Sequence, residues 1–395
     1  MTSLTAGTRP IARIARQSIG LQRWLRRAAA SLDRAIPATS ESQQLLTRHA
    51  PDVVLTLPDD DLSLALESAA AQADLVRAAA SLGVPTASIA TGPDAQIHAS
   101  LLQPGPSMVL VWNEAQRDAV VRHGAVGRDA VLVSGALALE RALTDTPLMT
   151  EQAFREAMGF PADRPFAFFC GSSGVLTNSR REMDLVRRWV ASLRDSEDPL
   201  LRELPVLIRP PVQSSRWRSL DFTGAGPVAF GPRRYEASGE LDRVLLAESV
   251  RYAAVVVGID AYTLAMAAAM GKRGIAISRA DAGSADETPI EFLWTTPGSS
   301  VSYAASLDDL NRQLRASLTS ESGRSRSPFA ATLTALHDGR RASDLAADGV
   351  ERLARQTVRR VRPRVRFGAV ATRVPLLLAA GVVSATGRGL QWRRR

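Results

Sequence analysis

The sequence predicts an α/β protein built from two doubly wound units in series, with basic helical segments at both ends. Three observations support this fold class. Short runs rich in Val, Ile and Phe alternate with stretches of helical periodicity, which is typical of a parallel sheet covered by helices. The 395 residues, 45% of them hydrophobic, suffice for two cores of ordinary size. The single cysteine, Cys170, excludes an internal disulfide framework and a Cys-rich metal site.

The first unit is expected over residues 51–148. Gly83 and Gly124 each directly follow a predicted helix. Glycine at that point favours the end of a helix, because the residue there commonly adopts the left-handed conformation. The expected elements are strand Val53–Leu57, helix Leu62–Leu82, strand Val84–Ala90, strand Met108–Trp112, helix Glu114–His123 and strand Val131–Ser134. A polar link with one short helix is expected over 136–163.

The second unit is expected over residues 149–340 and repeats the alternation. Its expected elements are strand Phe166–Cys170, helix Arg180–Arg194, strand Val206–Arg209, strand Val228–Phe230, helix Leu241–Arg251, strand Ala253–Ile259, helix Thr263–Met270 and strand Gly274–Ser278. Ligands of open α/β sheets bind at the carboxyl ends of the strands, so the residues that follow each strand are the candidates for chemistry.

The formal net charge of +9 is concentrated at the two ends of the chain. Residues 1–34 hold seven Arg and one acid, and residues 351–395 hold twelve Arg and one acid. The part between them is therefore acidic, which argues against a nucleic-acid-binding face spread over the fold. Four scattered His and one Cys offer no metal-ligand spacing, so neither a metal nor another cofactor is expected.

Residues 1–50 are expected to form a basic amphipathic segment, because apolar residues from Ile11 to Leu32 recur at helical spacing. Packing on the first unit and binding to an anionic membrane both stay open for it. Residues 341–395 are expected to form a helical basic tail. Its apolar run from Val374 to Ala385 is too short to span a bilayer, which requires roughly 20 apolar residues. The tail is predicted to contact an anionic membrane surface; a buried terminal helix is the alternative, and nucleic acid ranks last.

The ends of two predicted strands in the second unit are candidate phosphate sites. Ser172 and Ser173 lie in a Gly-Ser-Ser-Gly turn, whose small residues let backbone N–H groups approach an anion closely. Arg209 ends a predicted strand and can hold a phosphate through two N–H groups. An ordinary turn and a surface Arg are the simpler explanations of these residues.

Gly258, Asp260 and Thr263 form a third junction, where the N-terminus of a helix can receive a pyrophosphate. Helix capping alone also explains these residue types. The binding interpretation gains from coincidence, because all three junctions belong to one unit and would line one edge of its sheet.

Glu114 and Asp94 are the candidate catalytic bases of the first unit. Glu114 follows a predicted strand, although the helix dipole equally explains an acid in a first helical turn. Asp94 lies with His98 in a loop bounded by Gly and Pro. The acidic run Asp59–Asp61 directly precedes a helix and is explained as its cap.

Five stretches of the chain, in this order, resemble bacterial GT-B glycosyltransferase-like proteins of surface-polysaccharide synthesis. They read VLVWNEAQRDAVVRHGAVGRDAVLVSGA, FAFFCGSSG, VRRWVASLRDSEDPLLRELPVLIRPP, AAVVVGIDAYTLAMAAAMGKRGIAI and SYAASLDDL. The likeness covers roughly Val53 to Leu318 and extends in layout to the CDP-glycerol glycerophosphotransferases and to the UDP-N-acetylglucosamine 2-epimerase type of fold.

The resemblance implies two Rossmann-like domains of GT-B type that face each other across a cleft. It implies a nucleotide-linked donor on the second domain and an envelope glycan or lipid-linked acceptor on the first. The implied reaction transfers a sugar or glycerophosphoryl group in cell-envelope polysaccharide synthesis. The implied location is the cytoplasm, at the inner face of the membrane, where the basic ends would bind.

Three places depart from the pattern of that class. Pro211 stands where His is usual, Met266 where a Glu would bind the ribose, and Ala90–Asp94 where a Trp-Asp-Asn-like loop is usual. Each lost hydrogen-bond partner would weaken ligand binding by about 1–3 kcal/mol. The alternative function is therefore a catalytically inactive GT-B-fold protein that serves as a binding or scaffold module at the membrane surface.

Overall fold

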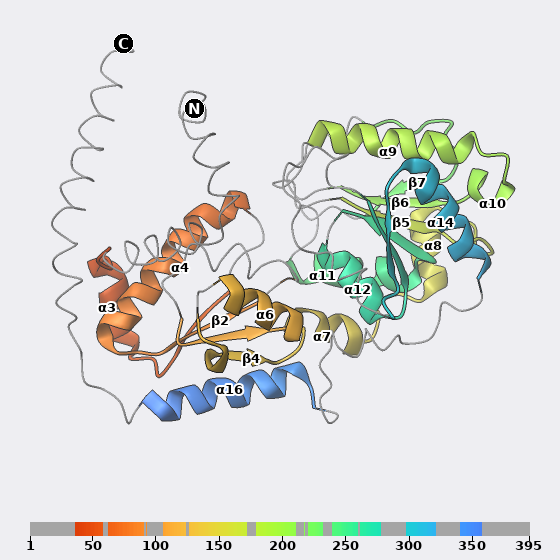
Figure 1. Ribbon diagram of the computed structural model, residues 1–395. Helices are drawn as coiled ribbons and strands as arrows, with labels where there is room; N and C mark the ends of the chain where they lie inside the picture. The colour runs from red at the N-terminus through yellow and green to blue at the C-terminus, as the bar shows by residue number, and fades with distance from the viewer. Residues whose placement is uncertain are drawn as a thin grey trace, which may run out of the picture.

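Figure 1 shows a computed structural model of the chain, in which two sheets lie in separate halves of the molecule and are connected through helix α7 (Leu137–Thr144). The structure describes residues 36–57, 62–90, 92, 106–123, 126–171, 179–210, 217, 220–231, 239–259, 261–277, 298–320 and 340–357. Of the two terminal segments singled out in the sequence, residues 1–35 and 358–395, which include the apolar run from Val374 to Ala385, lie outside the described residues.

The first sheet has four parallel strands in the order β1-β2-β3-β4, so each strand pairs with the next one along the chain. The strands are β1 (Val54–Thr56), β2 (Thr86–Ile89), β3 (Met108–Val111) and β4 (Val131–Val133). The helices that accompany them are α3 (Ser40–His49), α4 (Leu62–Leu82), α6 (Glu114–His123) and the 3-10 helix η1 (Arg128–Ala130). Helices α4 and α6 lie on the same side of this sheet in Figure 1.

Side chains of β3 alternate between two cores. Val109 and Val111 pack with Val120 of α6, whereas Leu110 packs on the opposite face with residues of α16 (Ala342–Thr357). The three strand residues are at most 2% exposed. Burial of both faces is typical of a parallel sheet, and it explains why the strand reads as a continuous apolar run.

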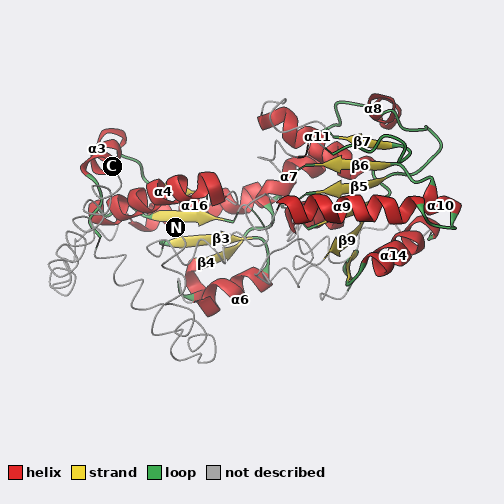
Figure 2. Ribbon diagram, turned by 90° about the horizontal axis from the view of Figure 1, so that it is seen from above, coloured by secondary structure: helices red, strands yellow, loops and turns green. Residues whose placement is uncertain are grey.

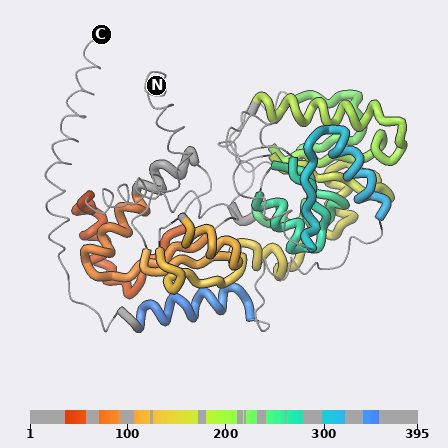
Figure 3. Tube along the Cα trace, in the orientation of Figure 1, coloured from red at the N-terminus to blue at the C-terminus, as the bar shows by residue number. Residues whose placement is uncertain are grey.

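Helix α16 comes late in the sequence but returns to cover the first sheet (Figures 1 and 3). Its Ala346 and Leu353 share a buried cluster with Ala87 and Leu110. Helix α7 fixes its N-terminus, because the Glu140 carboxylate accepts hydrogen bonds from the backbone N–H (2.9 Å) and the hydroxyl (2.7 Å) of Ser343. Residues 342–357 are therefore part of the first half of the fold, not only the start of a basic tail.

We expect Glu140→Ala to loosen α16. Loss of the carboxylate leaves the N-terminal N–H of Ser343 without its cap, which costs about 0.5–2 kcal/mol. Amide hydrogen exchange in 343–355 and urea unfolding measure the effect. Glu351→Ala is the matched control, because Glu351 forms an exposed pair with Arg355 on the same helix (2.7 Å). Equal protection of α16 in both variants would contradict the capping role.

The second sheet has six parallel strands in the order β10-β9-β8-β5-β6-β7. The strands are β5 (Ala167–Cys170), β6 (Val206–Arg209), β7 (Val228–Phe230), β8 (Val255–Gly258), β9 (Arg273–Ile277) and β10 (Val301–Ala304). The helices are α8 (Glu151–Met158), α9 (Ser179–Arg194), α10 (Pro199–Arg202), α11 (Gly239–Tyr252), α12 (Ala261–Ala269) and α14 (Leu307–Thr319).

Helices cover both faces of this sheet: in Figure 1, α9 lies on one side of the strands and α11 and α12 lie on the other, and Figure 2 shows α9 lying across the strands. Phe168 on one face packs in a cluster with residues of α8, α11 and α12. Phe169 on the other face packs with Trp189 of α9 and in the same cluster as Leu310 of α14. The second half is thus doubly wound, with the strands of its centre fully buried.

The two halves meet in an apolar joint with hydrogen bonds to α7. The Trp112 ring, just after β3, contacts the Tyr262 ring of α12 edge to face, with centroids 6.3 Å apart. The Tyr262 hydroxyl donates to the Ala138 carbonyl (3.0 Å), and Arg251 donates to the Ala142 carbonyl (2.9 Å). Helix α7 is therefore bound to α11 and α12 as well as to α16.

The elements agree closely with those predicted, and their differences have local causes. Helices α4 and α6 and strands β6 and β7 have the predicted bounds. Strand β2 starts later than predicted because the Val84 N–H donates to the Ala79 carbonyl at the end of α4 (2.9 Å). The link over 136–163 holds two helices, α7 and α8, rather than one. The Thr150 hydroxyl, which accepts from the Ala153 N–H, begins the second of them.

Candidate functional site

The carboxyl ends of three neighbouring strands form a row at one edge of the second sheet. Strand β5 is in the middle, and its last residue, Cys170, pairs with Arg209 of β6 and with Gly258 of β8. All three strands run parallel. The junctions that the sequence singles out after these strands therefore start from adjacent points. We call Arg209, Cys170 and Gly258 the strand-end row.

The strand-end row lies at the topological switch point of the sheet. From β5 the chain builds outward through β6 and β7 on one side, and then through β8, β9 and β10 on the other. Helix α9, after β5, and helix α12, after β8, cover opposite faces. Connections that diverge in this way leave a crevice at the carboxyl ends of the strands, where doubly wound sheets bind their ligands.

Gly258 allows the backbones of β5 and β8 to approach closely at this point. A Cβ atom on Gly258 would lie 2.6 Å from the Cys170 carbonyl oxygen, a distance that Cβ atoms essentially never show. The contact is to the backbone, so no side-chain movement relieves it. Glycine at the end of β8 is thus a steric requirement of the sheet, in addition to any role toward a ligand.

Arg209 forms a buried ion pair at the end of β6. Its Nη2 donates to both carboxylate oxygens of Asp242, at 2.9 and 2.8 Å. Arg209 is 9% exposed and Asp242 is 3% exposed. The pair holds the first turn of α11 against the strand-end row. The charge of Arg209 is therefore already partly balanced by a protein carboxylate where the sequence predicts a phosphate contact.

Thr263 lies beneath the strand-end row. Its hydroxyl is 3.2 Å from the Cys170 Sγ, and the residue is fully buried. This contact connects the first turn of α12 to the end of β5. Ser172, Ser173 and Asp260, the other predicted donor-binding residues, lie outside the described residues.

The side of α12 that faces the first half is apolar. Met266, which stands at the position of the ribose-binding Glu implied by the resemblance, is 2% exposed. It lies in the same buried cluster as Trp112 and Leu139. Tyr262 stands one turn earlier and contacts Trp112. Apolar packing between the halves therefore occupies the position where that class would present a carboxylate.

A buried polar network holds the loop after β2 against the end of β3. The Gln116 side chain accepts from the Trp112 backbone N–H (2.7 Å) and donates to the Gly92 carbonyl (3.1 Å). The Asn113 side chain accepts from the Gln116 N–H (2.9 Å), and the Trp112 indole donates to the Ala90 carbonyl (2.9 Å). Gln116 is absent from the residues that the sequence singles out, although a Gln three residues after an Asn is a helix-start signal.

Glu114, a predicted base, lies on the exposed N-terminal turn of α6. Its side chain is 59% exposed and forms ion pairs with Arg117 and, at 3.5 Å, with Arg128. Asp94, the other predicted base, lies outside the described residues. Within the described ranges, no group of three or more His, Cys, Asp or Glu is arranged to hold a metal ion.

Solved structures of UDP-N-acetylglucosamine 2-epimerases are similar to this chain in fold. The putative epimerase from Listeria monocytogenes has a TM-score of 0.55 at 11% identity, over 82% of this chain and 78% of that one. The Methanocaldococcus jannaschii structure in complex with UDP-GlcNAc and UDP has a TM-score of 0.52 at 10% identity, over 75% and 78%. The Neisseria meningitidis structure bound to UDP-GlcNAc has a TM-score of 0.50 at 12% identity, over 78% of each chain.

No protein-family model matches the chain, and no curated protein sequence matches it. The topology and the similar structures together define the class: an α/β protein with two Rossmann-like domains of GT-B type. This confirms the predicted fold class. Within that class, the solved structures compared above are UDP-N-acetylglucosamine 2-epimerases, and at 10–12% identity the likeness is one of fold.

Proposed function

We propose that the chain binds a nucleotide-linked donor at the strand-end row. The observation that carries this proposal is the meeting of Arg209, Cys170 and Gly258 at the switch point of a doubly wound sheet. Two of the similar solved structures hold UDP-GlcNAc, which supports a nucleotide sugar as the ligand. In this proposal, backbone N–H groups around Ser172 and Ser173 and the start of α12 receive the diphosphate.

The proposed reaction transfers a sugar or glycerophosphoryl group to an envelope glycan or a lipid-linked acceptor. The bond between the transferred group and the nucleotide breaks, a bond to an acceptor hydroxyl forms, and the hydroxyl proton passes to a base. Glu114 and Asp94 are the proposed bases. Arg209 and the N-terminus of α12 stabilise the negative charge on the departing nucleotide. The proposal uses neither a metal nor another cofactor.

A panel of UDP-, GDP- and CDP-linked donors tests donor binding. We expect one nucleotide class to bind saturably in calorimetry and to raise the melting temperature of the full chain. The free nucleoside diphosphate of that class should compete, because the strand-end row contacts the diphosphate. Absence of binding by every donor, with the protein folded by circular dichroism, would overturn the proposal.

A GT-B-fold binding module without catalysis is the second candidate function. The specific observation in its favour is the apolar surrounding of Met266, a buried residue that stands where the resemblance implies a ribose-binding carboxylate. Saturable donor binding with no release of nucleotide, in the presence of membrane extracts as acceptor source, would favour this candidate over transfer. Release of nucleotide would favour the transferase.

Restoring the polar residues at positions 211 and 266 tests whether the site is a donor site that has lost polar contacts or a site of another kind. If the site has merely lost polar partners, Pro211→His with Met266→Glu should raise donor affinity by about tenfold or more. Met266→Gln is the control for stability, since it places an uncharged polar group in the same apolar cluster. Unchanged affinity in a folded double variant would count against simple decay.

We also propose that the basic tail attaches the protein to an anionic membrane. Residues 358–395 hold ten Arg and no acid around an apolar run. Of the helices in the described part of the chain, none has both the length and the apolar composition that crossing a membrane requires.

Deletion of residues 358–395, which keeps α16 whole, should release the protein from anionic liposomes. Each Arg near such a surface contributes about 1 kcal/mol, so the loss is expected to be nearly complete. Co-sedimentation with vesicles of anionic and of neutral lipid measures it. Unchanged pelleting of the truncated chain would remove the tail from the membrane proposal.

A further inference from the structure

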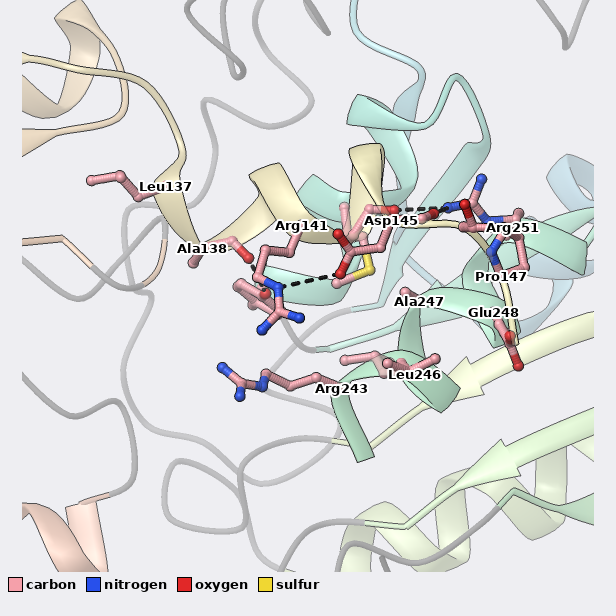
Figure 4. A pocket seen from close by; sticks show the side chains of 15 residues that line it. Leu137, Ala138, Arg141, Asp145, Pro147, Arg243, Leu246, Ala247, Glu248 and Arg251 are labelled. Atoms are coloured by element: carbon pink, nitrogen blue, oxygen red, sulfur yellow. Dashed lines mark hydrogen bonds and ion pairs between the residues drawn. The ribbon is translucent and has the colours of Figure 1, made fainter. Parts of the chain in front are cut away.

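A cavity lies at the joint between the two halves, apart from the strand-end row. Its walls come from α7 and the residues after it, from α11 and from α12 (Figure 4). Most of its surface is apolar, and Leu246, Ala247 and Met266 contribute buried side chains to it. The cavity thus touches the segment that connects the halves and two helices of the second half at once.

Small side chains explain why the helices leave space here. Ala138 and Ala142 stand one turn apart on α7, and Ala247 lies on the facing wall from α11. Methyl groups on both walls cannot fill the gap between two helices. The cavity volume is about 140 Å³. An engineered apolar cavity of about 150 Å³ binds benzene, so a body of ring size fits this space.

The charges around the cavity are unevenly distributed. Arg141 from α7 and Arg243 from α11 lie at the same end in Figure 4, and Glu248 lies at the opposite end. Asp145 accepts from the Arg141 Nε (3.2 Å), and Arg251 donates to backbone carbonyls of the α7 end. Among the side chains that line the cavity, three guanidinium groups stand beside two carboxylates, and those of Arg141 and Arg243 lie together at one end.

At its own end of the cavity, Glu248 is hydrogen-bonded to the protein through one carboxylate oxygen. One of its carboxylate oxygens accepts from the backbone N–H groups of Leu148 and Met149, at 2.5 and 3.0 Å. Burial and this carboxylate raise the pKa of the nearby Tyr252 phenol. An anion is therefore unfavourable at the Glu248 end, whereas the guanidinium groups of Arg141 and Arg243 supply N–H donors at the other end.

We infer that this joint cavity is a second ligand site, which binds a small organic anion. The ligand has an apolar body of about the size of one ring, held between α7 and α11, and a phosphate or carboxylate group placed at Arg141 and Arg243. Because those two side chains come from the linking helix and from the second half, a bound ligand holds the joint together. The cavity shares Met266 with the position that the resemblance assigns to ribose binding, but none of its lining residues belongs to the strand-end row.

Calorimetry on the full chain with four probes tests the inference. Phenyl phosphate and benzoate carry a ring and an anion, phenol carries the ring alone, and inorganic phosphate carries the anion alone. We expect saturable binding of phenyl phosphate or benzoate, with at least tenfold weaker binding of phenol and of inorganic phosphate. Whichever of the first two binds more tightly identifies the acidic group.

Three variants and one matched control locate the binding. Arg141→Gln and Arg243→Gln should each lower the affinity for the bound probe by about tenfold or more. Ala138→Leu, at an exposed position of α7, should fill the cavity and block binding. Arg187→Gln is the control, because Arg187 is also an exposed helical Arg paired along its own helix, with Asp184, but lies on α9. It should leave the affinity unchanged.

Several results would overturn the inference. These are equal affinity for phenol and phenyl phosphate, no saturable binding of any probe, or unchanged affinity in both Arg variants when circular dichroism shows them folded. Displacement of phenyl phosphate by UDP would make the cavity part of the donor site. Failure of all nucleotide donors to bind leaves these measurements unaffected, so the two proposals fail separately.

Discussion

Asp242→Asn should lower the free energy of unfolding by about 3–5 kcal/mol, because it leaves the Arg209 charge buried without its counter-charge. Arg209 is only 9% exposed, so little water reaches it to replace the lost carboxylate. Urea denaturation at constant m-value measures the change. Asp118→Asn is the matched control. Its pair with Arg128 has a similar length, 2.7 Å, but both side chains are at least 50% exposed, and we expect a loss below about 1 kcal/mol.

The double variant Arg209→Met with Asp242→Leu separates structure from function at the same pair. Replacing a whole buried ion pair by apolar side chains is often neutral for stability, so the double variant should be more stable than Asp242→Asn. If Arg209 also contacts the donor, the folded double variant should lose donor affinity. Wild-type donor affinity in that variant would limit the pair to holding α11 in place. A double variant less stable than the single one would contradict the ion-pair account.

Gly258→Ala should destabilise the protein by about 1–3 kcal/mol through overpacking. The added methyl group would lie 2.6 Å from the Cys170 carbonyl oxygen, so β8 must move away from β5. Gly127→Ala is the control, because a Cβ there meets nothing within 4 Å and the backbone φ of −73° suits any residue. We expect the control to stay within about 1 kcal/mol of wild type.

The same substitution also tests the position of the proposed donor site. Movement of β8 at its carboxyl end displaces the start of α12 and with it the proposed diphosphate contacts. Donor affinity of Gly258→Ala should therefore fall even at temperatures where the variant is fully folded. A destabilised variant with unchanged donor affinity would separate the tight strand contact from ligand binding.

Much of the fold was predictable because its signals are local. Strand β6 is a short apolar run bounded by Pro205 and Pro210, and helix α6 begins after Asn113, whose side chain caps the helix. The adjacency of the strand-end row was also predictable, since parallel strands of one unit place their carboxyl ends at one edge. What such reasoning finds is the placement of backbone and the ends of elements.

The partners of the site residues were not predictable, because they are distant in sequence. The sequence around Arg209 gives no sign that Asp242 forms an ion pair with it. Each residue, taken alone, is typical of a surface charge. The Glu140 cap on α16 joins residues more than 200 positions apart. Gly258 was predicted as a phosphate contact, but its steric role depends on the Cys170 carbonyl of another strand. Long-range pairing of this kind requires the three-dimensional arrangement.

The return of α16 to the first sheet sets an order for folding during synthesis. A ribosome completes strand β4 roughly 200 residues before it makes α16. At about 5–20 residues per second, the face of the first sheet formed by Ala87 and Leu110 stays uncovered for about 10 to 40 seconds. The second half, which needs no later segment for its two described cores, can fold first. The nascent first half is therefore the part of the chain that exposes an apolar sheet face while the rest is being made.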